Sequence, residues 1–365
     1  SDTSSVPSSL SLSINQSLYD GGRTNISVRQ AETNVQAERS RLFTTEQSVL
    51  LSGATAFADV ISARSVVDLQ TNNLERLEKQ LEATKERFKV GEVTRTDVAQ
   101  AEARVDRAKA DKIKASGDLI SSNSTYKRVF GKVASQLEAL EDVKDLPNGI
   151  TEAVNLALEN NFSLIAAKFE ELSALDGVSL SRSSLKPSVT LSGSASHSET
   201  SGDSDSSSTS ASVTANLNIP LYQAGAVYSG IRSAKEEANR RRILVESTRR
   251  NVIETSSKAF TAWRTAKAQA EALAAEVASA EIALEGVEQE ALVGARTVLD
   301  VLDAEQERLS AQVRLVRANR DTFVAAYSLL SALGKLTAKG LELPVETYDY
   351  DKNFVRVRNL YYGER

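Results

Sequence analysis

The chain has 365 residues, with 44 Lys and Arg against 49 Asp and Glu, a formal net charge of -5 at pH 7, and no Cys. The lack of Cys excludes disulfides, thiolate zinc sites and cysteine nucleophiles, and the interspersed charges form no clustered basic face for nucleic acid. No unbroken apolar run reaches the roughly 18 residues that a membrane-spanning helix needs.

Three segments alternate between apolar and small polar residues and are predicted to be strands. They cover residues 10–18, 188–196 and 212–219, and the Ser-rich stretch 200–210 is expected to be a solvated loop. Segments of about ten residues with this period are typical of transmembrane β-barrel strands. A half-buried sheet of a soluble protein is the alternative for any one segment. Three segments at matching positions, with no other sheet to pack on, favour the barrel.

Long stretches with helical periodicity and no Pro follow the first and third strands. Residues 24–89 would form a helix of roughly 100 Å at 1.5 Å per residue. Tyr19 and Tyr222 stand where the strands give way to these helices. They are interpreted either as packing aromatics or as membrane-interface aromatics of a barrel.

Each long helical stretch ends at a glycine, Gly91 or Gly294, and a second helix is predicted after Thr94 or Thr297. The chain should therefore contain two helical hairpins. Apolar residues recur every seven positions along the second return helix, at Leu302, Leu309, Val316, Phe323 and Leu330. Such spacing is typical of a coiled-coil seam. Ordinary globular helices run 8 to 20 residues, so helices of this length are expected to complete their packing by self-association.

The two hairpins are copies of one another. Residues 18–132 align without a gap to residues 221–335, at a constant offset of 203 positions. This offset divides the chain into a first repeat (1–132), an equatorial segment with an entry helix (133–187), a strand pair with the second repeat (188–335), and a C-terminal equatorial segment (336–365). By the same spacing, a helix and a strand of roughly fifty residues are expected before Ser1.

Several motifs resemble the TolC family of outer-membrane efflux and secretion channels. The most specific is the stretch 294–304, which is similar to that family's second hairpin turn; residues 219–225 and 88–91 also match. The resemblance covers nearly all of the chain. It implies an α+β, mostly α fold. In this fold a trimer shares one outer-membrane β-barrel, with four strands per protomer, of which the first is apparently absent here. The barrel continues into a long α-helical coiled-coil barrel with a small mixed equatorial domain.

Asp300 and Asp303 lie three residues apart at the start of the second return helix, and therefore on one face. Helix capping alone could explain acids at this place. The first copy, however, has Asp97 but Gln100 at the corresponding positions. By resemblance, Asp300 and Asp303 would form two carboxylate rings at the periplasmic entrance of a trimer. Rings of acids select cations.

The resemblance also assigns a latch that closes this entrance. Arg296 matches a family arginine that contacts a neighbouring hairpin, and Asp97 with Thr96 matches the partner side. An exposed pair of this kind contributes about 0 to 1 kcal/mol. Family members can add a tyrosine just before the second turn, where this chain has Ala291. Ordinary solvated charge is the alternative interpretation for Arg296.

The two turns are also candidate docking surfaces. Gly91 and Gly294 can be simple helix stops, because glycine tolerates the left-handed conformation. The resemblance adds that the turns form the tips bound by hairpins of a periplasmic adaptor. The residues concerned are Val90, Gly91, Thr94, Val293, Gly294 and Thr297.

Together with these features, the resemblance implies a channel-tunnel of the Gram-negative outer membrane that extends into the periplasm. It would export drugs, other small molecules or proteins. The expected partners are two further copies of the chain, outer-membrane lipid, a periplasmic adaptor and an inner-membrane transporter. No enzymatic motif is found, and no cofactor or metal is expected. The alternatives are a soluble coiled-coil filament or secreted structural protein, and a periplasmic adaptor, which should have only one hairpin.

Overall fold

The computed structural model describes residues 5–135, 137–141, 143, 145–202, 206–358 and 360. The chain forms two compact units. The first contains Ser1–Leu42 and Phe162–Arg250, and the second contains Phe43–Asn161 and Asn251–Arg365. Two helices of 67 residues each, α1 (Arg23–Lys89) and α5 (Ala226–Leu292), contribute to both units. The predicted long helices are thus present, and α1 begins within one residue of its expected start.

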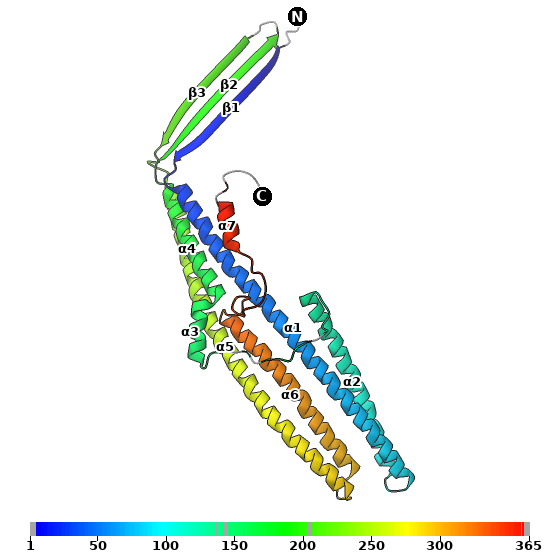
Figure 1. Cartoon of the computed structure of the whole chain (residues 1–365). Helices are drawn as coiled ribbons and strands as arrows, with labels where there is room; N and C mark the ends of the chain where they lie inside the picture. Colours follow the sequence, from blue (N-terminus) through cyan, green and yellow to red (C-terminus); the bar gives the residue numbers. More distant parts are fainter. Residues whose placement is uncertain are drawn as a thin grey trace. The chain divides into compact units, whose positions relative to one another are not determined.

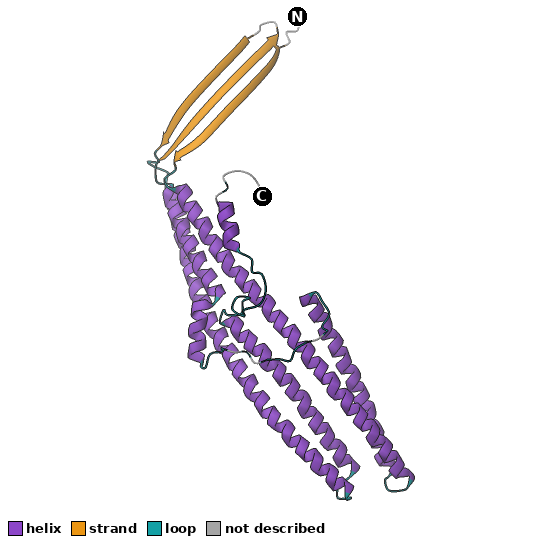
Figure 2. Ribbon diagram, in the orientation of Figure 1, coloured by secondary structure: helices purple, strands orange, loops and turns teal. Residues whose placement is uncertain are grey.

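The first unit contains a three-stranded antiparallel sheet in the order β1-β2-β3 (Figures 1 and 2). Its strands are β1 (Ser5–Tyr19), β2 (Ser188–Gly202) and β3 (Ser206–Asn218). All three predicted strands are confirmed. The prediction of a solvated loop over residues 200–210 was wrong for 200–202 and 206–210, which belong to β2 and β3, while residues 203–205 lie outside the described residues. Strand pairing continues to Thr200 and Ser206. Backbone hydrogen bonds need no particular side chain, so a Ser-rich composition did not prevent pairing.

The two faces of this sheet differ in chemistry. Leu12, Ile14 and Val213 lie on one face, and each is at least 65% exposed. The other face carries hydroxyl groups that pair across β2 and β3. These pairs are Ser194–Ser212 at 2.9 Å, Ser196–Ser210 at 2.8 Å and Ser198–Ser208 at 2.9 Å. His197, the only histidine, lies on the same face as Leu12 and Ile14 and bonds the hydroxyl of Thr209 at 2.9 Å.

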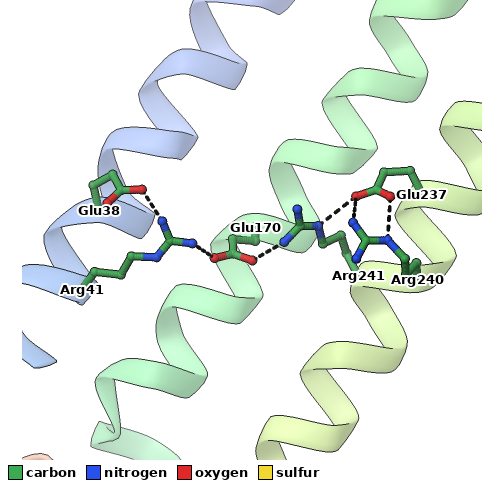
Figure 3. Close-up of polar contacts among 6 residues, drawn as sticks. All are labelled: Glu38, Arg41, Glu170, Glu237, Arg240 and Arg241. Atoms are coloured by element: carbon green, nitrogen blue, oxygen red, sulfur yellow. Dashed lines mark hydrogen bonds and ion pairs between the residues drawn. The ribbon is translucent and has the colours of Figure 1, made fainter.

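The helices of the first unit are held together by ion pairs. Asp176 of α4 (Phe162–Ser183) accepts a hydrogen bond from Arg29 of α1 at 2.8 Å. Further along α4, Glu170 binds Arg41 of α1 on one side and Arg241 of α5 on the other (Figure 3). Three helices distant in sequence are therefore joined through a single carboxylate.

The flanks of the Glu170 network are also charged. Arg41 pairs with Glu38, and Glu237 accepts hydrogen bonds from both Arg240 and Arg241 (Figure 3). These arginines lower the pKa of Glu237 from 4.5 to about 2, chiefly through their hydrogen bonds. Glu237 therefore stays ionised well below neutral pH.

The second unit contains two helical hairpins. The first is formed by the end of α1 with α2 (Arg95–Phe130), and the second by the end of α5 with α6 (Val298–Ala332). The predicted heptad positions Leu302, Leu309 and Leu330 are at most 5% exposed. The other two heptad positions, Val316 and Phe323, are only partly buried. The seam is therefore buried unevenly along α6.

The segment between the two copies contains two helices, α3 (Ile150–Asn160) and α4, rather than one. Asn161 separates them with an extended backbone conformation, and its side chain donates a hydrogen bond to the carbonyl oxygen of Ala332 at 3.2 Å. Gly334 lies against the same place, where an added Cβ would come within 2.2 Å of the Asn160 carbonyl oxygen. The end of α6 therefore packs closely on the break.

The C-terminal segment, which includes α7 (Tyr350–Arg358), packs on α1 within the second unit. The backbone amide of Ala338 donates to Glu46 at 2.7 Å, and the ring of Tyr350 meets that of Phe43 edge-on at 6.0 Å between centroids. Two contacts of different kinds thus anchor this segment on one helix.

One helix, α1, is long and apolar enough in part to cross a membrane. Its most apolar 18-residue window has a mean hydropathy of 1.3 and at most two charged residues. The expectation from unbroken apolar runs was therefore too strict, because Ser, Thr and Gly interrupt a run without making the window hydrophilic. A single such helix is weak evidence for a membrane span, and 22% of this window is buried in the structure.

Candidate functional site at the hairpin ends

The turn of the first hairpin is closed by backbone hydrogen bonds around a left-handed glycine. Gly91 has a φ of +80°, and the amide of Glu92 donates to the carbonyl oxygen of Arg87 at 2.9 Å. Thr94 then caps α2 in a reciprocal arrangement with Asp97. The Thr94 amide donates to the Asp97 carboxylate at 2.8 Å, and the Asp97 amide donates to the Thr94 hydroxyl at 3.3 Å.

The turn of the second hairpin repeats this geometry. Gly294 has a φ of +77°, and the amide of Ala295 donates to the carbonyl oxygen of Glu290 at 2.9 Å. Thr297 and Asp300 form the same capping box, with the same distances of 2.8 Å and 3.3 Å. Capping is therefore one role of Asp300, as the simpler interpretation of the sequence held.

Hydrogen bonding to the caps lowers the pKa of both aspartates. The backbone amide and then the hydroxyl of Thr94 lower the pKa of Asp97, and those of Thr297 do the same for Asp300. Arg296 adds a smaller electrostatic contribution at Asp300. Both tips therefore carry ionised carboxylates at neutral pH.

The tips differ in the charges that span each turn. In the first, Arg87 on the outgoing helix pairs with Glu92 beyond the turn, at 3.1 Å. In the second, Glu290 holds the position equivalent to Arg87 and pairs with Arg296 at 2.7 Å. The order of acid and base is thus reversed between the copies. Within the described chain Arg296 binds its own hairpin, and the structure brings it to neither Asp97 nor Thr96.

Asp303 takes part in a contact that joins the two hairpins. Arg104 of α2 donates to Asp303 of α6 at 2.5 Å, with side chains 25% and 58% exposed. A buried apolar cluster lies beneath the same region. It contains Leu74, Leu77, Val105, Ala108 and Leu302, with Leu81 and Val298 packed against it. The hairpins are therefore held together by apolar burial, and an ion pair crosses between them.

The remaining candidate residues lie on exposed surface. Thr96, Gly91 and Gly294 are exposed, and Val90 and Val293 are 72% and 81% exposed. Because both tips present a valine beside a glycine, they offer small, similar surfaces to any partner. Tyr19 ends β1 and is 49% exposed, whereas Tyr222 lies in the junction after β3 and is 88% exposed.

Sequence reasoning did not identify Arg104 or Glu305 as site residues. Arg104 and Asp303 are 199 positions apart, and no spacing rule relates charges on different hairpins. Glu305 is buried although it lies between exposed acids on α6. The signal available in the sequence was the repeat itself, because Asp303 replaces Gln100 and Glu307 occupies the position equivalent to Arg104.

Comparison with known proteins agrees with this architecture. The family model described as outer membrane efflux protein matches residues 1–132 and 153–335, and these stretches contain the two copies. The chain belongs to the outer membrane efflux protein family. It is thus an outer-membrane protein of efflux and secretion systems, consistent with the exposed apolar face of its sheet.

Individual relatives cover most of the chain. The outer membrane efflux protein BepC of Brucella suis is 34% identical over 97% of this chain and 78% of its own length. The outer membrane protein TolC of Vibrio cholerae is 28% identical, over 90% of this chain and 77% of its own length. Among solved structures, that of CusC aligns with a TM-score of 0.78 at 19% identity, covering 91% of this chain and 82% of that one. This last likeness concerns the fold.

Proposed function

We propose that three copies of this chain form one duct across the outer membrane and the periplasm. The observation that carries this proposal is the sheet. It has an exposed apolar face, an opposite hydroxyl-bearing face, and edges at β1 and β3 that no other strand of the described residues covers. An open sheet edge in lipid leaves backbone groups unpaired, which costs several kcal/mol for each group. Further strands must therefore pair with β1 and β3, and other copies of the chain can supply them.

The helices support the same assembly. The two hairpins leave apolar residues such as Ile113 and Ile282 more than 70% exposed, and a helical seam of this length gains stability when a neighbouring hairpin covers it. Under this proposal the hydroxyl face of the sheet lines the lumen. The apolar face then contacts outer-membrane lipid, with Tyr19 and Tyr222 near the membrane interface.

The duct is proposed to be gated at the ends of the hairpins. Asp300 and Asp303 would form carboxylate rings around the axis, and Arg296 with Asp97 and Thr96 would latch neighbouring hairpins. The Arg104–Asp303 pair adds a contact within the protomer that an opening hairpin would have to break. Because Arg104 partly neutralises Asp303, breaking it would also strengthen the negative ring.

The exposed tips are proposed to dock a periplasmic adaptor that links the duct to an inner-membrane transporter. The docking residues would be Val90, Gly91 and Thr94 with Val293, Gly294 and Thr297. The duct itself needs no cofactor in this scheme, because the transporter supplies the energy. Drugs, other small molecules or proteins would pass through it.

Extraction, mass and conductance test the assembly together. The purified protein should require detergent, have the mass of a trimer, and form discrete conducting pores in planar lipid bilayers. A soluble filament would instead be extracted without detergent and would conduct nothing. A monomer that stays soluble without detergent would overturn the proposal.

A further inference from the structure

The second hairpin buries a carboxyl group that the proposed duct does not use. Glu305 of α6 is 7% exposed, and its Oε2 atom has no protein hydrogen-bond partner among the described residues. One helical turn away on either side, Leu302 and Leu309 share its face and are at most 4% exposed. A carboxylate in such a place loses solvation without compensation, which is costly.

The equivalent residue of the first copy has different surroundings. Glu102 is exposed and forms an ion pair with Lys85 at 2.8 Å, with both side chains about half exposed. The 203-residue offset places Glu305 at the position of Glu102 and Glu288 at the position of Lys85. The second copy therefore replaces an exposed ion pair by two carboxyl groups, one of which is buried.

Groups from two neighbouring helices act on Glu305. Glu288 of α5 opposes its ionisation, and Arg76 of α1 favours it. Burial has the largest effect, and the net result is a raised pKa for Glu305. No ion pair joins Arg76 to Glu305 in the described part of the chain. The Arg76 guanidinium therefore stabilises the Glu305 carboxylate only by longer-range electrostatic attraction. Asp303 and Glu307 on α6 are exposed and turned to other partners, Arg104 and Arg314.

We propose that Glu305, opposed by Glu288, is a proton-binding site that controls how tightly the second hairpin packs on the first. With a proton on Glu305, the two carboxyl groups no longer repel and the buried position costs less. Without it, the hairpin is driven toward arrangements that expose Glu305 or bring it to Arg76. This site goes beyond the proposed gate, and it does not require that the protein be a channel.

The sign of the effect follows from linkage. A carboxyl group whose pKa is raised by folding makes its full contribution to the stability of the packed form when the pH is below its ordinary pKa of 4.5. That contribution is lost as the pH rises through the raised pKa. The packed second hairpin should therefore loosen as the pH rises from mildly acidic to neutral. The tip aspartates Asp97 and Asp300 have the opposite dependence, because their contribution is lost as the pH falls.

Hydrogen exchange of the full-length protein at residues 298–309, corrected for intrinsic rates between pH 5 and 8, tests this proposal. We expect the wild-type protein to lose protection as pH rises. Glu305→Gln should remain protected throughout, because it mimics the protonated acid. Glu288→Lys recreates the charge pair of the first copy and should also abolish the dependence. Arg76→Gln should move the transition to higher pH.

The matched control is Glu102→Gln, which alters the equivalent acid in the first copy and should keep the wild-type profile at residues 298–309. If wild type and Glu305→Gln show the same pH profile, the proton site is excluded. An unchanged profile in Glu288→Lys would likewise overturn the proposed role of the carboxyl pair. If Glu305→Gln fails to fold, Glu288→Lys and Arg76→Gln still decide the question.

Discussion

The two hairpins share their backbone geometry and differ in their charges. Both tips have a glycine with φ near +80°, a capping box with hydrogen bonds of 2.8 Å and 3.3 Å, and a closing backbone bond of 2.9 Å. Yet the acid and base across the turn are exchanged, Asp303 stands in place of Gln100, and Glu288 stands in place of Lys85. The two copies have therefore kept the same turn geometry while their charges differ. The differences in function should therefore lie in charged residues of the second copy.

The largest effect is expected from the apolar contact between the hairpins. Leu302 is 2% exposed in the shared cluster, whereas its counterpart Ala99 is exposed. Leu302→Ala should lower the free energy of unfolding by about 2 to 5 kcal/mol, since it removes buried methyl groups and leaves a cavity. Leu299→Ala, at a site that is 39% exposed, is the control and should cost clearly less. Denaturant unfolding of both variants would measure this; equal losses would contradict a special role for Leu302.

The caps should contribute equally in the two copies. Thr94→Ala and Thr297→Ala should each destabilise their helix by about 1 kcal/mol, because each removes the hydroxyl that accepts from the first turn. Exchange rates at the start of α2 and α6 would report the loss. A large difference between the two variants would show that the matching geometry hides unequal energetics.

The caps should also weaken in acid. Folding lowers the pKa of Asp97 and Asp300 below 3.8, so their contribution is present above that value and is lost as pH falls through the lowered pKa. Exchange protection at both helix starts should therefore decrease together below about pH 3.8. Protection that rises at one tip in this range would be inconsistent with the assigned hydrogen bonds.

A smaller effect is expected from the Arg104–Asp303 pair. Its partly exposed side chains limit the coupling energy to about 0.2 to 1 kcal/mol. A double-mutant cycle with Arg104→Gln and Asp303→Asn isolates this coupling. The 203-residue offset places Glu307 and Gln100 at the equivalent pair of positions, where one side chain is uncharged. A cycle with Glu307→Gln and Gln100→Ala provides a comparison in which no coupling should appear. A coupling of zero at Asp303 would mean that the ion pair does not help to hold the hairpins together.

The smallest effect is expected from exchanging the charges that span the second turn. Glu290→Arg combined with Arg296→Glu would give this tip the charge order of the first, where Arg87 precedes Glu92. Thermal stability should change little, because an exposed ion pair is kept in either order. Each single variant should be less stable than the double variant. If the single variants and the double variant were equally stable, the Glu290–Arg296 ion pair would contribute nothing to stability.

Local features were predictable from the sequence, and contacts between distant segments were not. The alternation around Leu12 and Ile14 predicted a strand, and Gly91 and Gly294, followed by Thr94 and Thr297, predicted where helices end and begin again. These signals lie within a few residues of each other, so local chemistry decides them. The repeat added one long-range prediction, that both turns have the same geometry.

The missed features depend on which helices meet. The burial of Glu305, its proximity to Arg76, and the pairing of Arg104 with Asp303 all depend on how separate hairpins pack. The break at Asn161 likewise involves the end of α6. The strands also extend beyond their predicted ends, because pairing between β2 and β3 overrides the turn preference of serine. In the helical cases a contact far along the chain decided the local structure, and in the strands the pairing of neighbouring segments did.

Ion selectivity of single pores in planar bilayers tests the central claim most directly, namely that functional charge lies in the second hairpin. Under a salt gradient, wild type should be cation-selective, and Asp300→Asn with Asp303→Asn should shift the reversal potential toward zero. The matched control, Asp106→Asn with Asp111→Asn, removes two charges from α2 and should leave the potential unchanged. Unchanged selectivity in the Asp300 and Asp303 variant, or an equal shift in the control, would contradict the account.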